Sequence, residues 1–167
     1  MNVFKNLLRF TAVIAAAQLF WTSSLQAAVA DKATDVQAAP VALIGVQGYD
    51  LVSYHQPTGP VRGSGFHVAE HKGVSYMFAN AENKATFQAK PEEYLPAYGG
   101  YCAFGVAVGQ KFPVNPLRYK LVDGKLYLNL DGDIQAKWNE DVAGHIKKAD
   151  ANWKQIATKT PAQLAAK

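Results

Sequence analysis

One cysteine and one histidine in this sequence have the types and setting of metal ligands. Cys102 follows Tyr98-Gly99-Gly100-Tyr101 and stands where a helix is expected to begin, a position that favours the metal-binding thiolate. His55 ends an expected strand beside Tyr54, and an imidazole combined with a thiolate suits copper or zinc. We therefore predict a copper or zinc site formed by Cys102 and His55. The alternatives are that Cys102 is a buried core residue and that His55 is an ordinary surface histidine.

Tyrosines and glycines near these positions predict a small ligand-binding hollow. The run from Tyr98 to Gly109 has no charged residue, and a segment of that kind is buried or faces a ligand. Two alternatives stay open: a core network of hydrogen-bonded tyrosines, and glycines that serve only the backbone torsions. The candidate ligand-binding residues are Tyr49, Tyr54, Tyr98, Gly99, Gly100 and Tyr101.

A third pattern, His67-Val68-Ala69-Glu70-His71, matches the H-x-x-E-H motif of some zinc proteases. That motif needs a helix, and the segment between Gly65 and Gly73 is too short for a stable one. In a strand, residues four apart are separated by about 13 Å, too far to share one zinc ion. A zinc hydrolase using His67, Glu70 and His71 is therefore the least favoured function.

The N-terminus has the features of an export signal. Lys5 and Arg9 precede an apolar stretch over 10–21 that is shorter than the about 20 residues of a membrane span. Ala28-Val29-Ala30 then has the form of a signal-peptidase site. We predict a signal peptide over 1–30, a periplasmic or secreted protein, and no stable membrane insertion after cleavage. The single cysteine excludes an internal disulfide.

Composition limits the remaining possibilities. Cleavage after Ala30 leaves 137 of the 167 residues, enough for one domain, and 49% hydrophobic with 18% charged residues indicates a globular chain. Removing Lys5 and Arg9 from 17 basic residues leaves 15 against 13 acidic ones, and no basic stripe indicates nucleic acid. The chain has no G-x-S-x-G, P-loop, dinucleotide or C-x-x-C motif.

Strand signals predict how the candidate residues are positioned. Alternation over 49–55 predicts a strand, and short apolar runs on either side of His71-Lys72-Gly73 predict a hairpin over 66–78. A second hairpin is expected over 119–130, because Asp123-Gly124 suits a type I′ turn.

Helix signals complete the expected fold. Asn80 predicts a capped helix over 81–89, and Pro91 predicts the start of a second short helix. Apolar residues from Ile134 to Ile156 recur every three or four positions, which predicts one long amphipathic helix that Gly144 kinks or splits. The fold class is α+β: a small antiparallel sheet of hairpins, short helices and a long C-terminal helix. We expect a flexible leader over 31–45, the domain over 46–157 and a C-terminal tail over 158–167.

Five blocks of this sequence carry a family resemblance: Gly48-Tyr49-Asp50-Leu51-Val52-Ser53-Tyr54, 73–83, 91–103, 122–129 and Ala149-Asp150-Ala151-Asn152-Trp153. In order and spacing they resemble the YHS-domain proteins of the stand-alone exported type, and they cover nearly all of 46–153. The resemblance implies a small α+β module in a group often regarded as metal-binding. We predict a non-enzymatic exported module that binds a transition metal or small ligand; the alternative is a structural or protein-interaction domain without metal.

Overall fold

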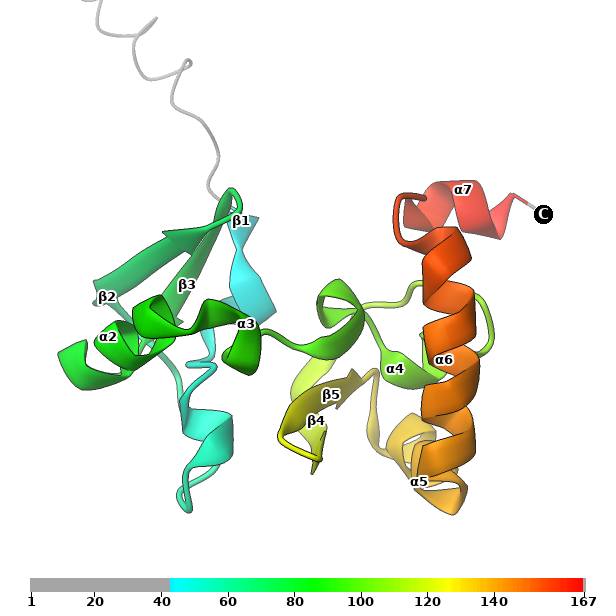
Figure 1. Cartoon of the computed structure of the whole chain (residues 1–167), viewed down its shortest axis with the longest axis horizontal. Coiled ribbons are helices and arrows are strands. Elements are labelled where there is room, and N and C mark those ends of the chain that lie inside the picture. Colours follow the sequence, from blue (N-terminus) through cyan, green and yellow to red (C-terminus); the bar gives the residue numbers. More distant parts are fainter. Residues whose placement is uncertain (1–42, 167) are drawn as a thin grey trace, which may run out of the picture. The chain divides into compact units, whose positions relative to one another are not determined.

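The computed structural model describes residues 43–166, which form a mixed α+β fold with a three-stranded sheet and a two-stranded sheet (Figure 1). The strands are β1 (Leu43–Ile44), β2 (Ser64–His71), β3 (Val74–Phe78), β4 (Asn115–Val122) and β5 (Lys125–Asn129). The helices are α2 (Ala81–Ala89), α3 (Pro91–Tyr94), α4 (Ala103–Ala107), α5 (Gly132–Glu140), α6 (Val142–Ile156) and α7 (Pro161–Ala165). Three short 3-10 turns are η1 (Gly45–Gly48), η2 (Ser53–His55) and η3 (Ala97–Gly100).

The predicted signal peptide, residues 1–30, lies outside the described residues, as does the leader over 31–45 except for its last three positions. Those three positions are folded, since they form β1 and the start of η1. Within 43–166 no helix combines the length and the apolar character that crossing a membrane would require.

The two predicted hairpins are confirmed. β2 and β3 pair antiparallel across Lys72-Gly73, and β4 and β5 pair across Asp123-Gly124. All four turn residues have φ between 50° and 75°, as a type I′ turn requires. The expectation of one antiparallel sheet is wrong, because the hairpins lie in separate sheets and β1 pairs with β3 in parallel.

The segment predicted as a strand, residues 49–55, is instead a turn followed by η2, and Asp50 explains why. Its buried carboxylate accepts the N–H groups two and three residues later through Oδ1, at 2.9 and 3.3 Å. Oδ2 accepts the N–H of Ala79 at 2.9 Å and the side-chain amide of Asn83 at 2.6 Å. A side chain that satisfies nearby N–H groups competes with a strand ladder. Asp50 therefore bends this segment and ties it to the start of α2.

Both short central helices begin as the sequence predicts. The Asn80 side chain caps α2 by accepting the N–H three residues later at 2.8 Å. Pro91 occupies the first turn of α3 together with two glutamates, which the helix dipole favours there. α3 ends at Tyr94, so Pro96 lies just beyond it.

The predicted long C-terminal helix is two helices that meet at Asp141. This residue leaves helical geometry, with φ −150° and ψ 71°, and its carboxylate accepts the N–H of Gly144 at 2.9 Å as the cap of α6. A Cβ at Gly144 would lie 2.0 Å from that carboxylate, so the glycine leaves room for the cap. The predicted split is confirmed, but it lies three residues before Gly144.

Residues 158–167, predicted as a tail, contain α7. The Thr160 hydroxyl accepts the N–H of Gln163 at 3.3 Å, and the Gln163 side chain accepts the N–H of Thr160 at 2.9 Å. This reciprocal pair is a capping box. Leu164 is buried in the same apolar cluster as Trp138, so folded structure continues beyond residue 157.

Two apolar clusters stabilise these elements. One packs α2 on the first sheet around Phe78 and Phe87 and reaches β5 through Leu126. The other lies among α4, α5 and α6 around Val106 and Trp138. Each fully buried aromatic ring contributes roughly 2 to 3 kcal/mol, so the two clusters supply a core without disulfides.

Candidate functional site

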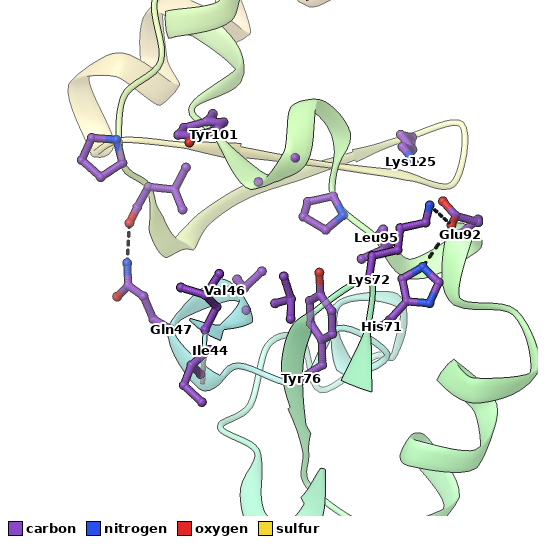
Figure 2. Close-up of a pocket in the computed structure, with 18 of the residues that line it drawn as sticks. Ile44, Val46, Gln47, His71, Lys72, Tyr76, Glu92, Leu95, Tyr101 and Lys125 are labelled. Carbon is purple, nitrogen blue, oxygen red and sulfur yellow. Dashed lines mark hydrogen bonds and ion pairs between the residues drawn. The ribbon is translucent and has the colours of Figure 1, made fainter. Parts of the chain in front are cut away.

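A groove of about 850 Å³ lies between the wall formed by β1, η1 and β3 and the wall formed by η3, β5 and α6. Figure 2 shows Ile44, Val46 and Tyr76 on the first wall and Tyr101 across from them. The volume is within the range of roughly 300 to 1,000 Å³ that is usual for small-molecule sites. The groove is therefore of ligand size, and strands, turns and helices from both parts of the fold help to shape it.

Two turns with left-handed backbone border this groove. In η1, Val46 and Gln47 have φ of 45° and 53°; in η3, Tyr98 and Gly99 have φ of 55° and 62°. Left-handed backbone at a side-chain-bearing residue costs about 1 to 3 kcal/mol, and a β-branched residue such as Val46 rarely adopts it. Backbone strain of this kind is concentrated at binding and catalytic sites. Residues with left-handed backbone therefore lie on or beside both walls of the groove.

Tyr76 directs its hydroxyl into the groove from β3 (Figure 2). Its ring lies against Gly45, where an added Cβ would be 2.3 Å from the ring carbon Cε1, so a larger residue would displace the ring. Within residues 43–166 the hydroxyl has no hydrogen-bond partner, although the residue is largely buried. Burial, with a smaller effect from Glu92, raises the pKa of Tyr76. The hydroxyl is therefore protonated at neutral pH and available as a donor.

An aromatic surface formed by Tyr101 and Trp153 is held in place by Lys111. The Lys111 ammonium lies 4.9 Å from the centre of each ring, a cation–π distance. It donates to the backbone carbonyls of Ala157 at 2.8 Å and Lys159 at 2.6 Å. Burial lowers the pKa of Lys111. The lysine thus fixes this wall of the groove to the end of α6.

One end of the groove carries charge. Glu92 accepts from Lys72 at 2.6 Å and pairs with His71 at 3.1 Å (Figure 2). These two contacts, first that of Lys72, lower the pKa of the Glu92 carboxyl. Lys125 of β5 lines the same end and has no ion-pair partner among the residues described. Two ammonium groups therefore face one carboxylate here.

The opposite end is closed by a neutral contact. The Gln47 side-chain amide donates to the backbone carbonyl of Val114 at 2.7 Å and so joins η1 to the loop before β4. Pro113 and Leu43 add apolar surface to the lining. The groove thus has a charged end, an aromatic and aliphatic middle, and an uncharged end.

Cys102, the predicted metal ligand, is buried away from this groove lining, with 1% of its surface exposed. It caps α4: its sulfur accepts the N–H of Gly105 at 3.4 Å and the thiol donates to Asn129 Oδ1 at 3.8 Å. The Phe112 ring packs on Gly105 beside it. Burial raises the pKa of the Cys102 thiol despite the backbone N–H groups that face it. The helix start predicted at this residue is correct, and the thiol stays protonated.

His55, the second predicted metal ligand, lies elsewhere. Its ring packs edge-on against Tyr94, with centroids 5.2 Å apart, and burial lowers its pKa. It lines a separate hollow of about 450 Å³ together with Glu93 and Asp123. None of the contacts found within 43–166 joins His55 to Cys102, and nowhere in that range do three His, Cys, Asp or Glu side chains gather closely enough to hold a metal.

Of the six predicted ligand-binding residues, Gly99, Gly100 and Tyr101 line the groove. Tyr54 and Tyr98 are buried and donate to the Pro116 carbonyl and the Asp150 carboxylate, each at 2.9 Å, as the core-network alternative anticipated. The guanidinium of Arg62 lies over the ring of Tyr49, 4.9 Å from its centre.

Most of the groove lining was not predicted from the sequence, and Gly45, Tyr76 and Trp153 show why. Gly45 falls in the predicted leader, Tyr76 belongs to an ordinary hairpin strand, and Trp153 matches a core stripe. The glycine pair at 99–100 was the one local signal for this site, and both residues have positive φ.

The H-x-x-E-H segment lies on β2, as expected, and its two histidines have different surroundings. His71 pairs with Glu92 at the charged end of the groove. His67 is not in the groove lining. The strand therefore does not give this segment the helical arrangement that a zinc protease motif needs.

The groove has the volume of a small-molecule site, an apolar middle with neutral donors that include Tyr76, and two lysines against one glutamate in its lining. Comparison with protein-family models, with curated proteins and with solved structures finds no match to this chain.

Proposed function

We propose that the chain is an exported, non-enzymatic binding module of the YHS type whose ligand is a small organic molecule held in the groove. The observation that carries this proposal is that two strained turns and an unpartnered tyrosine hydroxyl meet on one hollow of ligand size. The Tyr76 hydroxyl is not among the fully buried polar atoms without a partner, so a molecule in the groove can reach it.

The apolar lining supports binding more than catalysis. Small-molecule sites are mostly apolar with a few placed polar groups, and Tyr76 and Lys125 are such groups here. The walls are held by contacts that need no ligand, notably Gln47 with Val114 and Lys111 with the end of α6. A groove that is already formed loses little conformational entropy when it is occupied.

The test uses N-phenyl-1-naphthylamine, an uncharged dye whose emission rises in apolar sites. We expect saturable binding to the purified protein. Replacing the groove residue Ile44 by Trp should weaken binding, because the larger side chain obstructs this part of the groove. Leu117→Trp is the matched control, because Leu117 is similarly exposed but not in the groove lining. Equal binding by both variants, or none by the wild type, would contradict the proposed function.

The geometry favours this groove over a copper or zinc site at Cys102 and His55, since a protonated buried thiol is a poor metal ligand. Elemental analysis of protein purified without a histidine tag separates the two. We expect the same copper and zinc content in wild type and Cys102→Ser. Metal that is present in the wild type and lost in the variant would restore the thiol site.

A further inference from the structure

Resting on the proposed function, we infer that the groove takes an amphiphilic monoanion: an apolar body along the aromatic middle and a single acidic group between Lys72 and Lys125. A medium-chain carboxylate is the simplest molecule of this class.

The charge at this end is unbalanced. Lys72 and Lys125 line this end together with one carboxylate, that of Glu92, which already accepts from Lys72 and His71. Lys125 is partly buried and unpaired within the described range. An ammonium in such a position gains most from an anion that is also removed from water. A bound carboxylate would give each lysine an acidic neighbour.

The adjoining hollow carries further carboxylates. Lys125 and Glu92 border both the groove and that hollow, which Glu93 and Asp123 also line. Glu93 pairs with Lys90 at 3.1 Å. Glu93 and Asp123 are not in the groove lining, and the experiment below includes a cation to measure their effect.

The middle of the groove favours an uncharged chain. Tyr101, Trp153 and Val46 add aromatic and aliphatic side chains to the lining, and none of the charged residues of the lining lies among them. One N–H of the Gln47 side-chain amide is engaged with the Val114 carbonyl. Tyr76 is a neutral donor on this path, with its hydroxyl directed into the groove (Figure 2).

Three amphiphiles with unbranched tails of nine or ten carbons and different head groups test the sign of the charge. Decanoate, decan-1-ol and decyltrimethylammonium are titrated against protein loaded with N-phenyl-1-naphthylamine, and displacement gives each affinity. We expect decanoate to bind about tenfold more tightly than decan-1-ol, since a charge-assisted contact adds roughly that factor. We expect the cation to be weakest. Shortening the carboxylate should weaken binding about fourfold per methylene group.

One variant and its control test whether Lys125 contributes to binding of the carboxylate. Lys125→Gln should weaken decanoate about three- to tenfold and leave decan-1-ol unchanged. Lys147→Gln, on the exposed face of α6, is the control and should change neither.

The possible results distinguish failure of the acidic-ligand inference from failure of the proposed binding function. If decan-1-ol equals decanoate, if the cation binds best, or if Lys125→Gln has no effect on decanoate, the acidic-ligand inference is overturned while the groove remains a binding site. If no decyl compound displaces the dye and the dye itself fails to distinguish Ile44→Trp from Leu117→Trp, both are overturned.

Discussion

Cys102 and Tyr76 each place a polar atom in a largely apolar setting, but only one of these atoms has protein partners. The Cys102 sulfur accepts an N–H from Gly105 and faces Asn129. The Tyr76 hydroxyl has neither a donor nor an acceptor within the part of the chain described, and it faces a groove. A polar atom with partners contributes to stability, whereas one without partners in a hollow is available to a ligand.

This contrast separates two kinds of site: saturated sites, whose polar atoms have protein hydrogen-bond partners, and open sites, whose polar atoms lack such partners and face the groove. Asp50 belongs with Cys102, because its carboxylate oxygens accept four hydrogen bonds. Tyr76 and Lys125 belong to the open groove. Substitutions at saturated sites should reduce the free energy of unfolding and spare binding. Substitutions at the open groove should weaken ligand binding and leave the free energy of unfolding nearly unchanged.

The largest expected effect is at Asp50. Asp50→Ala leaves three backbone or side-chain donor groups around α2 and η2 without their acceptor, so we expect a loss of about 3 kcal/mol or more in the free energy of unfolding. Urea denaturation measures it. Glu140→Ala, at an exposed position of α5, is the control and should change stability by less than about 0.5 kcal/mol. A loss at Asp50 below about 1 kcal/mol would show that water replaces these bonds.

The sharpest form of the contrast uses one chemical change at two tyrosines. Tyr54→Phe removes a buried hydroxyl that bonds the Pro116 carbonyl, and we expect a loss of about 1 to 2 kcal/mol in stability with unchanged dye affinity.

Tyr76→Phe removes a hydroxyl without a protein partner. We expect less than about 0.5 kcal/mol change in stability and about threefold weaker decanoate binding. Thermal unfolding measures the stability of each variant, and dye displacement measures its affinity for decanoate. If Tyr76→Phe destabilises the protein as much as Tyr54→Phe does, Tyr76 is a saturated core residue and the division fails.

The smallest expected effect concerns the pH dependence of stability. Burial raises the pKa of Cys102 above its usual value of 9.0, so the folded state holds this proton more tightly than the unfolded state. The resulting stability is complete below the unfolded pKa and is lost as pH rises through the folded pKa. Relative to Cys102→Ser, the wild type should lose stability above about pH 8.5. If the difference in urea midpoint between the wild type and Cys102→Ser is the same at all pH values, folding does not raise the pKa of the Cys102 thiol.

Local features of this fold were predictable because they depend on neighbouring residues. The Asp123-Gly124 turn, the Asn80 cap and Pro91 at the start of α3 each act within one turn of the chain. The break at Asp141 was harder, because the apolar stripe continues across it. Asp50 was missed because two of its hydrogen-bond partners are about thirty residues away, so alternation alone suggested a strand.

The groove could be predicted only in part. Gly99, Gly100 and Tyr101 are adjacent and uncharged, which is a local signal. Gly45 and Tyr76 come together only when β1 pairs with β3. The left-handed backbone of Val46 has no sequence signal, since this residue type disfavours it.

The most direct test of the groove is a two-dimensional NMR titration of the purified protein with decanoate. We expect the shifted amide signals to cluster at Gly45 to Gln47 and at Gly99 to Tyr101, together with the indole signal of Trp153, while the signals around Cys102 and His55 stay in place. Shifts centred on Cys102 or on the His55 hollow, or no saturable shifts, would contradict it.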